Sequence, residues 1–299
     1  MMNKDMRKQP FFSIATPCWN SVSTIEKTIK SVLAQGFKDY EYIIIDGGST
    51  DGTIDIIKKY ESLFEGRMKW RSEPDNGLYD AFNKGVGQSI GVYCWNVNSD
   101  DFLEPDALKV LYEYIVKHSL DQMTIISGAM NFLTPKGELV KVMRCSYEAL
   151  ERAYRLDTIG INHPATIVPK LVYDKYGAFD PNYKIIGDAD WYHRVYAAGV
   201  KFALIDTVIT NMTDGGISNL LVYDKEIKDR LYFLRKHYPS QTERIRRRIK
   251  WTYKFYKEKL ARYAKQTAAI SREQNENNGV KIWSRIIAFM LKFRGRLKH

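Results

Sequence analysis

Apolar and polar residues form two kinds of pattern along the first hundred residues. Runs of β-prone apolar residues at 11–16, 40–46 and 90–97 predict three buried strands. Between the first two runs, apolar residues recur at helical spacing from Ile25 to Leu33, which predicts an amphipathic helix. Strand, helix and strand in this order form the βαβ unit of a parallel sheet. We therefore expect an α/β fold in which helices flank a mainly parallel sheet.

Proline, glycine and apolar spacing set the predicted limits of the other elements. Pro17 cannot donate to a strand ladder, so we expect it to end the first strand. A third strand is predicted at 70–73, and a short helix at 79–84 that ends at the following glycine. Pro105 begins a helix that continues to Lys117. Farther along, the pattern predicts strands at 123–129, 162–168 and 201–207 and a helix at 189–198.

Polar residues gather where the predicted strands end. Asp46 begins a loop of small polar residues, and the strand at 90–97 leads into Asn98-Ser99-Asp100-Asp101. Ligands of open α/β sheets bind at the carboxyl ends of the strands, so two adjacent carboxylates there are placed to hold a cation. The same residues also fit an ordinary Asx turn with a helix cap nearby. Taken alone, this stretch leaves both interpretations open.

The composition is that of a globular chain without a membrane span. Of its 299 residues, 44% are hydrophobic and 13% aromatic. No apolar run approaches the roughly 18 residues of a membrane-spanning helix. The first ten residues are polar and lack a signal-peptide core, so we expect a cytoplasmic protein. Cys18, Cys94 and Cys145 form no CxxC spacing, which argues against a zinc site or a disulfide framework.

Charge is distributed unevenly along the chain. The sequence holds 46 Lys and Arg against 35 Asp and Glu, a formal net charge of +11. Residues 225–299 carry 22 of the basic and 6 of the acidic residues, which leaves 24 against 29 for residues 1–224. A basic tail on an acidic body indicates an anionic surface as partner, either lipid headgroups or nucleic acid.

The loops at the predicted strand ends lack two common nucleotide-binding motifs but resemble those of a known enzyme family. Neither GxGxxG nor GxxxxGK[ST] is present, so a dinucleotide site and a P-loop are not indicated. Five stretches recur in a known order: Thr16-Pro17 with Asn20, Ser31 to Gln35, Ile43 to Thr53, Asn76-Gly77 through Asn83-Lys84-Gly85, and Asn98 to Asp101. On these stretches, residues 11 to about 115 resemble the inverting nucleotide-sugar glycosyltransferases of family 2, whose GT-A fold is a Rossmann-like mixed sheet flanked by helices. The segment 74–81 (PDNGLYDA) looks like transferases that build bacterial cell-surface polysaccharides.

The resemblance implies roles for residues on the donor side. Asp46 would face the base, and Asp100 would bind a divalent metal, Mn²⁺ or Mg²⁺, which oxygen ligands suit. The family usually has Asp-x-Asp where this chain has Asn98-Ser99-Asp100, so Asn98 would bond a ribose hydroxyl and the relative roles of Asp100 and Asp101 stay open. The donor-binding residues implied in this way are Thr16, Pro17, Asn20, Asp46, Asn83, Asn98 and Asp101.

A second stretch resembles the family on the acceptor side. Residues 187–194 are similar to its Glu-Asp-x-Asp-Leu-Trp-x-Arg motif, with Gly187 in place of Glu. Alignment on Arg194 makes Asp188 the catalytic base, although Asp188 also fits as the N-cap of the next helix. His163, Arg194 and Ser218 would lie on the acceptor or diphosphate side, with Ser218 in a Gly-Gly-Ile-Ser lid. A structural histidine and an ordinary surface turn are the alternatives for His163 and Ser218.

The domain organisation follows from these patterns and from the basic tail. We expect a GT-A catalytic domain at 1–222, with a nucleotide-binding half at 11–115 and an acceptor half at 116–222. A helical, basic extension would occupy 223–299. Within it, 281–298 is a short basic amphipathic helix that we expect to bind the inner face of the cell membrane peripherally, and not nucleic acid. A helical tail packed on itself is the alternative.

The sequence thus predicts a metal-dependent inverting glycosyltransferase. It would move a sugar from a nucleotide-diphosphate sugar, expected to be UDP-linked, to a hydroxyl of a lipid-linked saccharide in cell-surface polysaccharide synthesis. Inversion needs a carboxylate base for the attacking hydroxyl and a cation at the leaving diphosphate. The alternative is a non-catalytic GT-A-like module that binds nucleotide or glycan and is tethered by its tail. The presence of Asp46, Asp100 and Asp188 argues against it.

Overall fold

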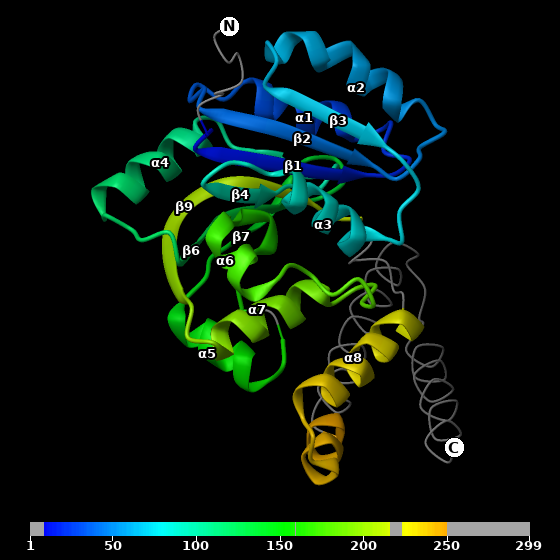
Figure 1. The fold of residues 1–299 in the computed structure, drawn as a ribbon, viewed down its shortest axis with the longest axis vertical. Coiled ribbons are helices and arrows are strands. Elements are labelled where there is room, and N and C mark those ends of the chain that lie inside the picture. Colours follow the sequence, from blue (N-terminus) through cyan, green and yellow to red (C-terminus); the bar gives the residue numbers. More distant parts are fainter. Residues whose placement is uncertain (1–8, 159, 216–222, 250–299) are drawn as a thin grey trace, which may run out of the picture. The chain divides into compact units, whose positions relative to one another are not determined.

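The computed structural model describes residues 9–158, 160–215 and 223–249 (Figure 1). Strands and helices alternate along these residues, as the hydrophobic pattern predicts. The strands are β1 (Phe12–Cys18), β2 (Tyr40–Asp46), β3 (Met68–Ser72), β4 (Tyr93–Asn96), β5 (Phe102–Leu103), β6 (Thr124–Leu133), β7 (Leu139–Met143), β8 (Thr166–Pro169) and β9 (Lys201–Thr213). The helices are α1 (Ile25–Leu33), α2 (Thr53–Glu61), α3 (Leu78–Gln88), α4 (Ala107–Lys117), α5 (Tyr147–Arg155), α6 (Lys170–Tyr176), α7 (Gly187–Ala197) and α8 (Tyr223–His237), with 3-10 turns η1 (Ser62–Phe64) and η2 (His163–Ala165).

The strands of the described chain form one mixed sheet in the order β3-β2-β1-β4-β8-β6-β9-β5, with β7 paired to β6. From β3 to β4 all neighbours are parallel. β8 then pairs antiparallel to both β4 and β6. The parallel half therefore ends at β4, and β4 joins it to the mixed half. The expected α/β class with a GT-A-like mixed sheet is confirmed.

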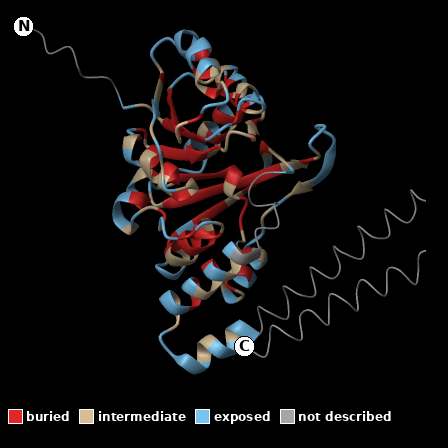
Figure 2. Ribbon diagram, turned by 90° about the vertical axis from the view of Figure 1, so that its right-hand side faces the viewer, coloured by how far each residue is buried: buried red, intermediate tan, exposed pale blue. Residues whose placement is uncertain are grey.

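Alternate residues of the buried strands face two separate layers of helices. On β2, Tyr42 and Ile44 pack in the large core that also contains Ile29 of α1 and Leu111 of α4. Ile43 and Ile45 face the other side and pack with Ala81 of α3. Because β2 is covered on both faces, its run of apolar residues is continuous, as in parallel sheets. Figure 2 shows the buried residues concentrated along the strands.

Three element limits predicted from single residues are wrong. α4 begins at Ala107, after the N-cap Asp106, and not at Pro105. β1 continues through Pro17 to Cys18. β4 pairs with β1 only as far as Ala15. At Pro17, the edge of β1 that would need the missing N–H therefore has no neighbouring strand to bond. α3 continues through Gly85 to Gln88. A Cβ at Gly85 would approach that of Ala15 to 2.9 Å, so the glycine serves the close packing of α3 on β1 and does not end the helix.

Three strand limits in the acceptor half differ from the prediction. β6 and β9 extend to Leu133 and Thr213, and the register between them shifts between Ser127 and Ala129. β8 begins only at Thr166, because residues 163–165 form the 3-10 turn η2. No helix among the described residues has the length and apolarity to cross a membrane. The chain divides into two compact units, Met1–Arg230 and Leu231–His299, so the first unit includes the start of α8 beyond the expected limit at residue 222.

Candidate functional site

Hydrogen bonds tie the loop after β1 to the loop after β2. Asn20 has a left-handed backbone with φ 49°, a conformation that asparagine tolerates. Its backbone N donates to Ser49 Oγ at 2.7 Å, and its side-chain Oδ1 accepts from Thr50 N at 3.0 Å. Val22 N donates to Asp51 Oδ2 at 3.0 Å. These bonds hold Asn20 at the carboxyl edge of the sheet.

Asp46 is the last residue of β2 and is fully buried. Its carboxylate accepts from the backbone N of Gly48 at 3.0 Å and of Ser49 at 2.9 Å, and from the hydroxyls of Ser49 and Ser72. Burial opposes its ionisation, but the hydrogen bonds outweigh burial and hold the pKa of Asp46 below its usual value. In this structure Asp46 organises the loop, and its contact with a base stays a prediction.

The acid pair lies in the turn after β4. Asp101 is 1% exposed, and its Oδ2 accepts from Asn98 Nδ2 at 2.9 Å. Burial raises the pKa of Asp100, and burial together with the adjacent Asp100 charge raises the pKa of Asp101 well above its usual value. A nearby cation would favour the ionised form of both carboxyls. Asn98 Oδ1 is buried without a hydrogen-bond partner among the described residues, so it can accept from a ligand.

A cavity of about 400 Å³ opens beside this turn. Five of the residues predicted to bind donor or metal line it: Pro17, Asn20, Asn98, Asp100 and Asp101. They come from the ends of β1 and β4, as expected for a ligand site of a parallel sheet. Its walls also include Trp19, which is 64% exposed, Asp75 before α3, and Met212 and Gly215 at the end of β9.

Asp188 lies in the first turn of α7, one residue inside the helix. The prediction that it is the N-cap of the helix is wrong, because the N-cap is Ile186, whose side chain makes no capping hydrogen bond. Asp188 Oδ1 accepts from Ala189 N at 2.8 Å and from the Tyr79 hydroxyl at 3.2 Å. Tyr79 belongs to α3, whose first turn contributes to the cavity wall. The candidate base is thus linked to the donor side through one tyrosine.

Gly187 makes this link possible. A Cβ at position 187 would come within 2.8 Å of the Tyr79 ring. Contacts this short do not occur between packed side chains, so the ring occupies the space that any larger residue would need. The glycine that replaces the family's usual Glu therefore admits Tyr79 against the start of α7.

His163 is close enough to Asp188 for their charges to interact. Its Nδ1 lies 3.1 Å from the Tyr192 hydroxyl, and its ring packs edge-on against Phe82 and Phe179. Burial lowers the pKa of His163, and the negative charge of Asp188 only partly opposes this shift. The neutral imidazole is favoured near pH 7. Its Nε2 has no hydrogen-bond partner in the part of the chain that the structure describes.

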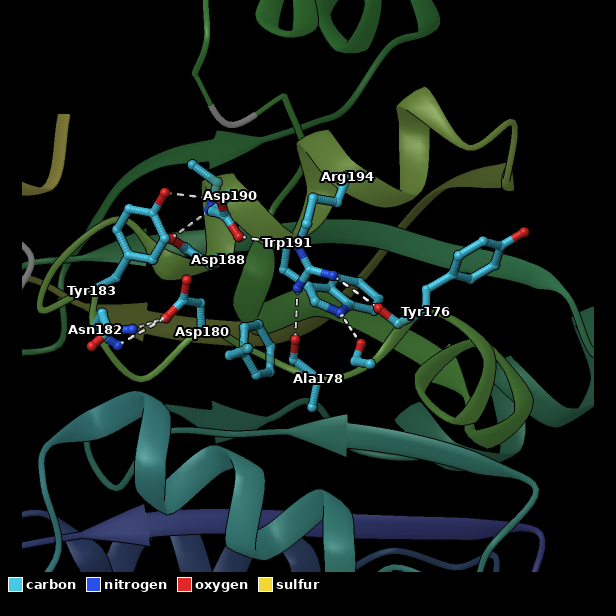
Figure 3. A network of polar contacts seen from close by, with 12 residues as sticks. Tyr176, Ala178, Asp180, Asn182, Tyr183, Asp188, Asp190, Trp191 and Arg194 are labelled. Carbon is cyan, nitrogen blue, oxygen red and sulfur yellow. Dashed lines mark hydrogen bonds and ion pairs between the residues drawn. The ribbon is translucent and has the colours of Figure 1, made fainter. Parts of the chain in front are cut away.

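The guanidinium of Arg194 forms hydrogen bonds to other residues of the acceptor half (Figure 3). Its Nε donates to Asp190 Oδ2 at 3.1 Å, and its two terminal nitrogens donate to the carbonyls of Tyr176 and Ala178 at 2.8 and 2.6 Å. Asp190 is fully buried and also accepts from the Tyr183 hydroxyl at 2.9 Å. This network fixes α7 to the loop before it. A diphosphate contact by Arg194 would compete with these bonds and stays a prediction.

Two other predicted residues, Asn83 and Thr16, are not among the described residues that line the cavity. Asn83 bonds the backbone of Phe179 with both ends of its amide, at 2.7 and 2.9 Å. Thr16 is fully buried, and its hydroxyl accepts from Tyr42 at 3.1 Å. Ser218 lies outside the described residues, as does the segment 281–298. Donor, acceptor and lid roles for these residues stay predictions.

A family model matches the part of the chain that forms most of the sheet and of the cavity wall. The model of glycosyl transferase family 2 matches residues 13–176, from β1 through α6. The chain belongs to glycosyl transferase family 2. Of the cavity-lining residues that the structure describes, only Met212 and Gly215 fall outside the family 2 match, and the candidate base Asp188 also lies beyond it.

Two curated relatives of this family 2 chain are a glycosyltransferase named for PGL/p-HBAD biosynthesis and a hyaluronan synthase. A PGL/p-HBAD biosynthesis glycosyltransferase from Mycobacterium tuberculosis is 27% identical over 229 residues, which are 74% of this chain and 84% of the relative. Hyaluronan synthase from Pasteurella multocida is 33% identical over 135 residues, which are 45% of this chain and 14% of the synthase.

Solved structures share the fold at low sequence identity. TarS residues 1–349 from S. aureus, in complex with UDP-GlcNAc, aligns with a TM-score of 0.61 at 20% identity and covers 79% of this chain and 69% of that one. A mannosyltransferase from Pyrobaculum calidifontis, in complex with GDP-Man and Mn²⁺, aligns with a TM-score of 0.56 at 12% identity and covers 78% and 66%. This family 2 chain spans 42% of a longer TarS structure.

Sequence reasoning missed several residues that shape the site. Asp75 was part of a recognised motif but had no role assigned, and its Oδ1 accepts from Gly77 N at 2.8 Å at the cavity wall. The link from Tyr79 to Asp188 spans 109 residues, and no local spacing indicates it. Met212 lies on the part of β9 that the strand prediction left out.

Proposed function

We propose that this family 2 glycosyltransferase moves a sugar from a UDP-sugar to a saccharide hydroxyl with inversion at the anomeric carbon. The observation that carries the proposal is the cavity of about 400 Å³ lined by Asn98, Asp100 and Asp101. It lies at the carboxyl ends of parallel strands, where ligands of such sheets bind. The UDP preference is supported by TarS, which has the same fold and was solved with UDP-GlcNAc.

The proposed cofactor is Mn²⁺ or Mg²⁺, and the residues present fit a hard cation. Asp100 would hold it, and the unpartnered Oδ1 of Asn98 is a further oxygen nearby in sequence. The described residues hold no group of three or more His, Cys, Asp or Glu side chains suited to a metal, so diphosphate oxygens of the donor would complete the ligand set. When bound, the cation would neutralise charge on the leaving diphosphate. GalNAc-T7 and the Pyrobaculum enzyme were solved with Mn²⁺.

Asp188 is the proposed general base. It would take the proton of the acceptor hydroxyl as that oxygen attacks the anomeric carbon, which gives a β-linked product from an α-linked donor. Tyr79 orients the carboxylate through its hydroxyl at 3.2 Å. His163 would remain neutral and offer Nε2 to an acceptor hydroxyl, while Ser218 would belong to a lid that excludes water.

The proposed acceptor is a lipid-linked saccharide at the membrane surface. Support comes from the names of the mycobacterial relative and of hyaluronan synthase, which refer to a glycolipid pathway and a surface polysaccharide. The basic segment 281–298 would hold the enzyme on the inner leaflet, with each cation contributing roughly 1 kcal/mol near anionic lipid. Deleting 281–299 should abolish co-sedimentation with vesicles that contain phosphatidylglycerol. Undiminished sedimentation of the truncated protein would contradict the membrane role.

Calorimetric titration of UDP, GDP and dTDP, each with and without Mn²⁺, tests the donor site. We expect UDP to bind in a metal-dependent way, and Asp100→Ala to remove that dependence. Asp55→Ala is the matched control, because Asp55 is an exposed acid on α2 outside the cavity. Binding of a different nucleotide would correct the donor class, and binding of none would replace the enzyme by a non-catalytic module.

A further inference from the structure

The segment just before α7 determines where Asp188 lies. α7 begins at Gly187, and its N-cap Ile186 provides no side-chain acceptor for the free N–H groups at the helix start. Buried N–H groups without acceptors destabilise a fold, so the backbone that leads into the helix needs an acceptor from another part of the chain.

Asp229 of α8 is the acceptor for the backbone N–H groups that lead into α7, which are those of the N-cap Ile186 and of the two residues before it. Its Oδ2 accepts from the backbone N of Lys184 at 2.8 Å, of Ile185 at 2.6 Å and of Ile186 at 3.1 Å. Asp229 is 4% exposed, so water does not compete for these bonds. Charged acceptors make stronger hydrogen bonds than neutral ones, and a carboxylate at a helix N-terminus is also favoured by the helix dipole. The three converging bonds therefore hold residues 184–186 tightly.

A second element holds the same segment from the donor half. The Tyr79 hydroxyl donates to the Ile185 carbonyl at 2.7 Å, and Lys184 Nζ donates to the Asn76 carbonyl at 2.8 Å. Ile185 thus has its N–H bound by Asp229 and its carbonyl bound by Tyr79. The same Tyr79 hydroxyl lies 3.2 Å from Asp188 Oδ1.

We propose that Asp229 is a positioning residue that places Asp188 for proton transfer by fixing residues 184–186 before α7. This inference rests on the proposed function, because it concerns the geometry of the base in that reaction. Asp229 makes no direct contact with Asp188 that the structure records, and it acts through the backbone it binds. The start of α8 is then part of the catalytic unit, and a chain cut at residue 222 would lack it.

The test compares full-length Asp229→Ala and Asp229→Asn with the matched control Glu226→Ala. Glu226 lies one turn earlier on α8, where it pairs with Arg230 at 3.7 Å, and no recorded bond joins it to residues 184–186. The activity probe is release of UDP from UDP-GlcNAc with Mn²⁺, in which water takes the place of the acceptor hydroxyl. Hydrogen exchange at the amides of 184–190 is measured on the same proteins, because it needs no turnover.

We expect Asp229→Ala to lower kcat roughly tenfold to a hundredfold with the KM for donor within about twofold, since small displacements of a reacting group carry such costs. Its 184–190 amides should exchange faster, while those of 46–53 stay unchanged. Asp229→Asn should recover part of kcat, because an amide oxygen still accepts from the backbone. A purely structural role would lower stability in all variants and would not separate kcat from KM.

Unchanged kcat or unchanged exchange at 184–190 in Asp229→Ala would overturn the inference while the proposed function stands. An equal loss of kcat in Glu226→Ala would also overturn it, because the effect would then belong to α8 as a whole. A parent protein that neither binds UDP nor releases it from UDP-GlcNAc would overturn the proposed function instead.

Discussion

The donor side and the acceptor side of the site are held in place by different kinds of contact. On the donor side, the carboxylates also have side-chain partners within their own loops, such as Ser49 for Asp46 and Asn98 for Asp101, each three residues away, beside longer links such as Asn20 to Ser49. On the acceptor side, Asp188 depends on Tyr79, 109 residues earlier, and its segment depends on Asp229, more than 40 residues later. Contacts within one loop are visible as a motif, whereas contacts between distant segments are visible only in the fold.

The largest effect should come from the base itself. Asp188→Asn removes the proton acceptor, so we expect transfer to fall roughly 10²-fold to 10⁴-fold. UDP binding should stay unchanged in calorimetry, because the cavity walls that carry Asn98 and Asp100 are held by their own contacts. Asp174→Asn, an exposed acid on α6, is the control. If Asp188→Asn transferred sugar at the parent rate, the base would have to be another residue.

A methyl group at Gly187 should disturb the same junction less severely. Gly187→Ala forces the Tyr79 ring or α7 to move, and overpacking of this kind costs about 1–3 kcal/mol of unfolding free energy. Gly87→Ala on α3 is the contrasting change, because nothing lies within 4 Å of its Cβ position, and it should raise stability by about 0.4–1 kcal/mol. Thermal unfolding of both variants measures the difference. Equal shifts would show that Tyr79 does not constrain position 187.

Removing a single tyrosine hydroxyl on the acceptor side or on the donor side should affect different properties of the enzyme. Tyr79→Phe deletes the donor to Ile185 and Asp188, and we expect about a tenfold lower kcat. Tyr42→Phe deletes a buried hydroxyl that bonds Thr16 in the donor half, and should cost about 1 kcal/mol of stability without changing kcat. Steady-state kinetics with denaturant unfolding distinguishes them. A kcat loss in both would mean that the two sides are not held independently.

The smallest effect concerns the buried cysteines, which we expect not to be alkylated in the folded protein. Burial, followed by the charge of Asp46, raises the pKa of Cys18, and burial raises the pKa of Cys94 to about 12. Thiolates are the reactive form, so both cysteines should resist iodoacetamide at pH 8 in the folded protein. Cys145 is less buried and should react first. Unfolded protein provides the control in which all three react, and rapid labelling of native Cys18 would contradict the burial of the donor loop.

Periodicity predicted much of the fold, because strands such as β2 are covered on both faces and leave continuous apolar runs. The predicted element ends at Pro17 and Gly85 were wrong. Pro17 is tolerated in β1 because no strand pairs with that edge there, and Gly85 is needed for packing against Ala15. The donor residues at the cavity were predictable because motif and strand end coincide. The contacts that hold Asp188 were not, since Tyr79 bonds it and Asp229 bonds the segment before it only after folding has brought these distant residues together.

The position of β4 has a consequence for how the protein is made. β4 pairs with β1 along one edge and with β8 along the other, and about 70 residues separate β4 from β8 in the chain. Ribosomes add roughly 5–20 residues per second, so the second edge of β4 waits on the order of 4–14 s for its partner. An unpaired strand edge invites association with other chains. We expect nascent chains that end between residues 117 and 165 to require chaperone protection at this edge, and pauses in translation there to lower the yield of folded enzyme.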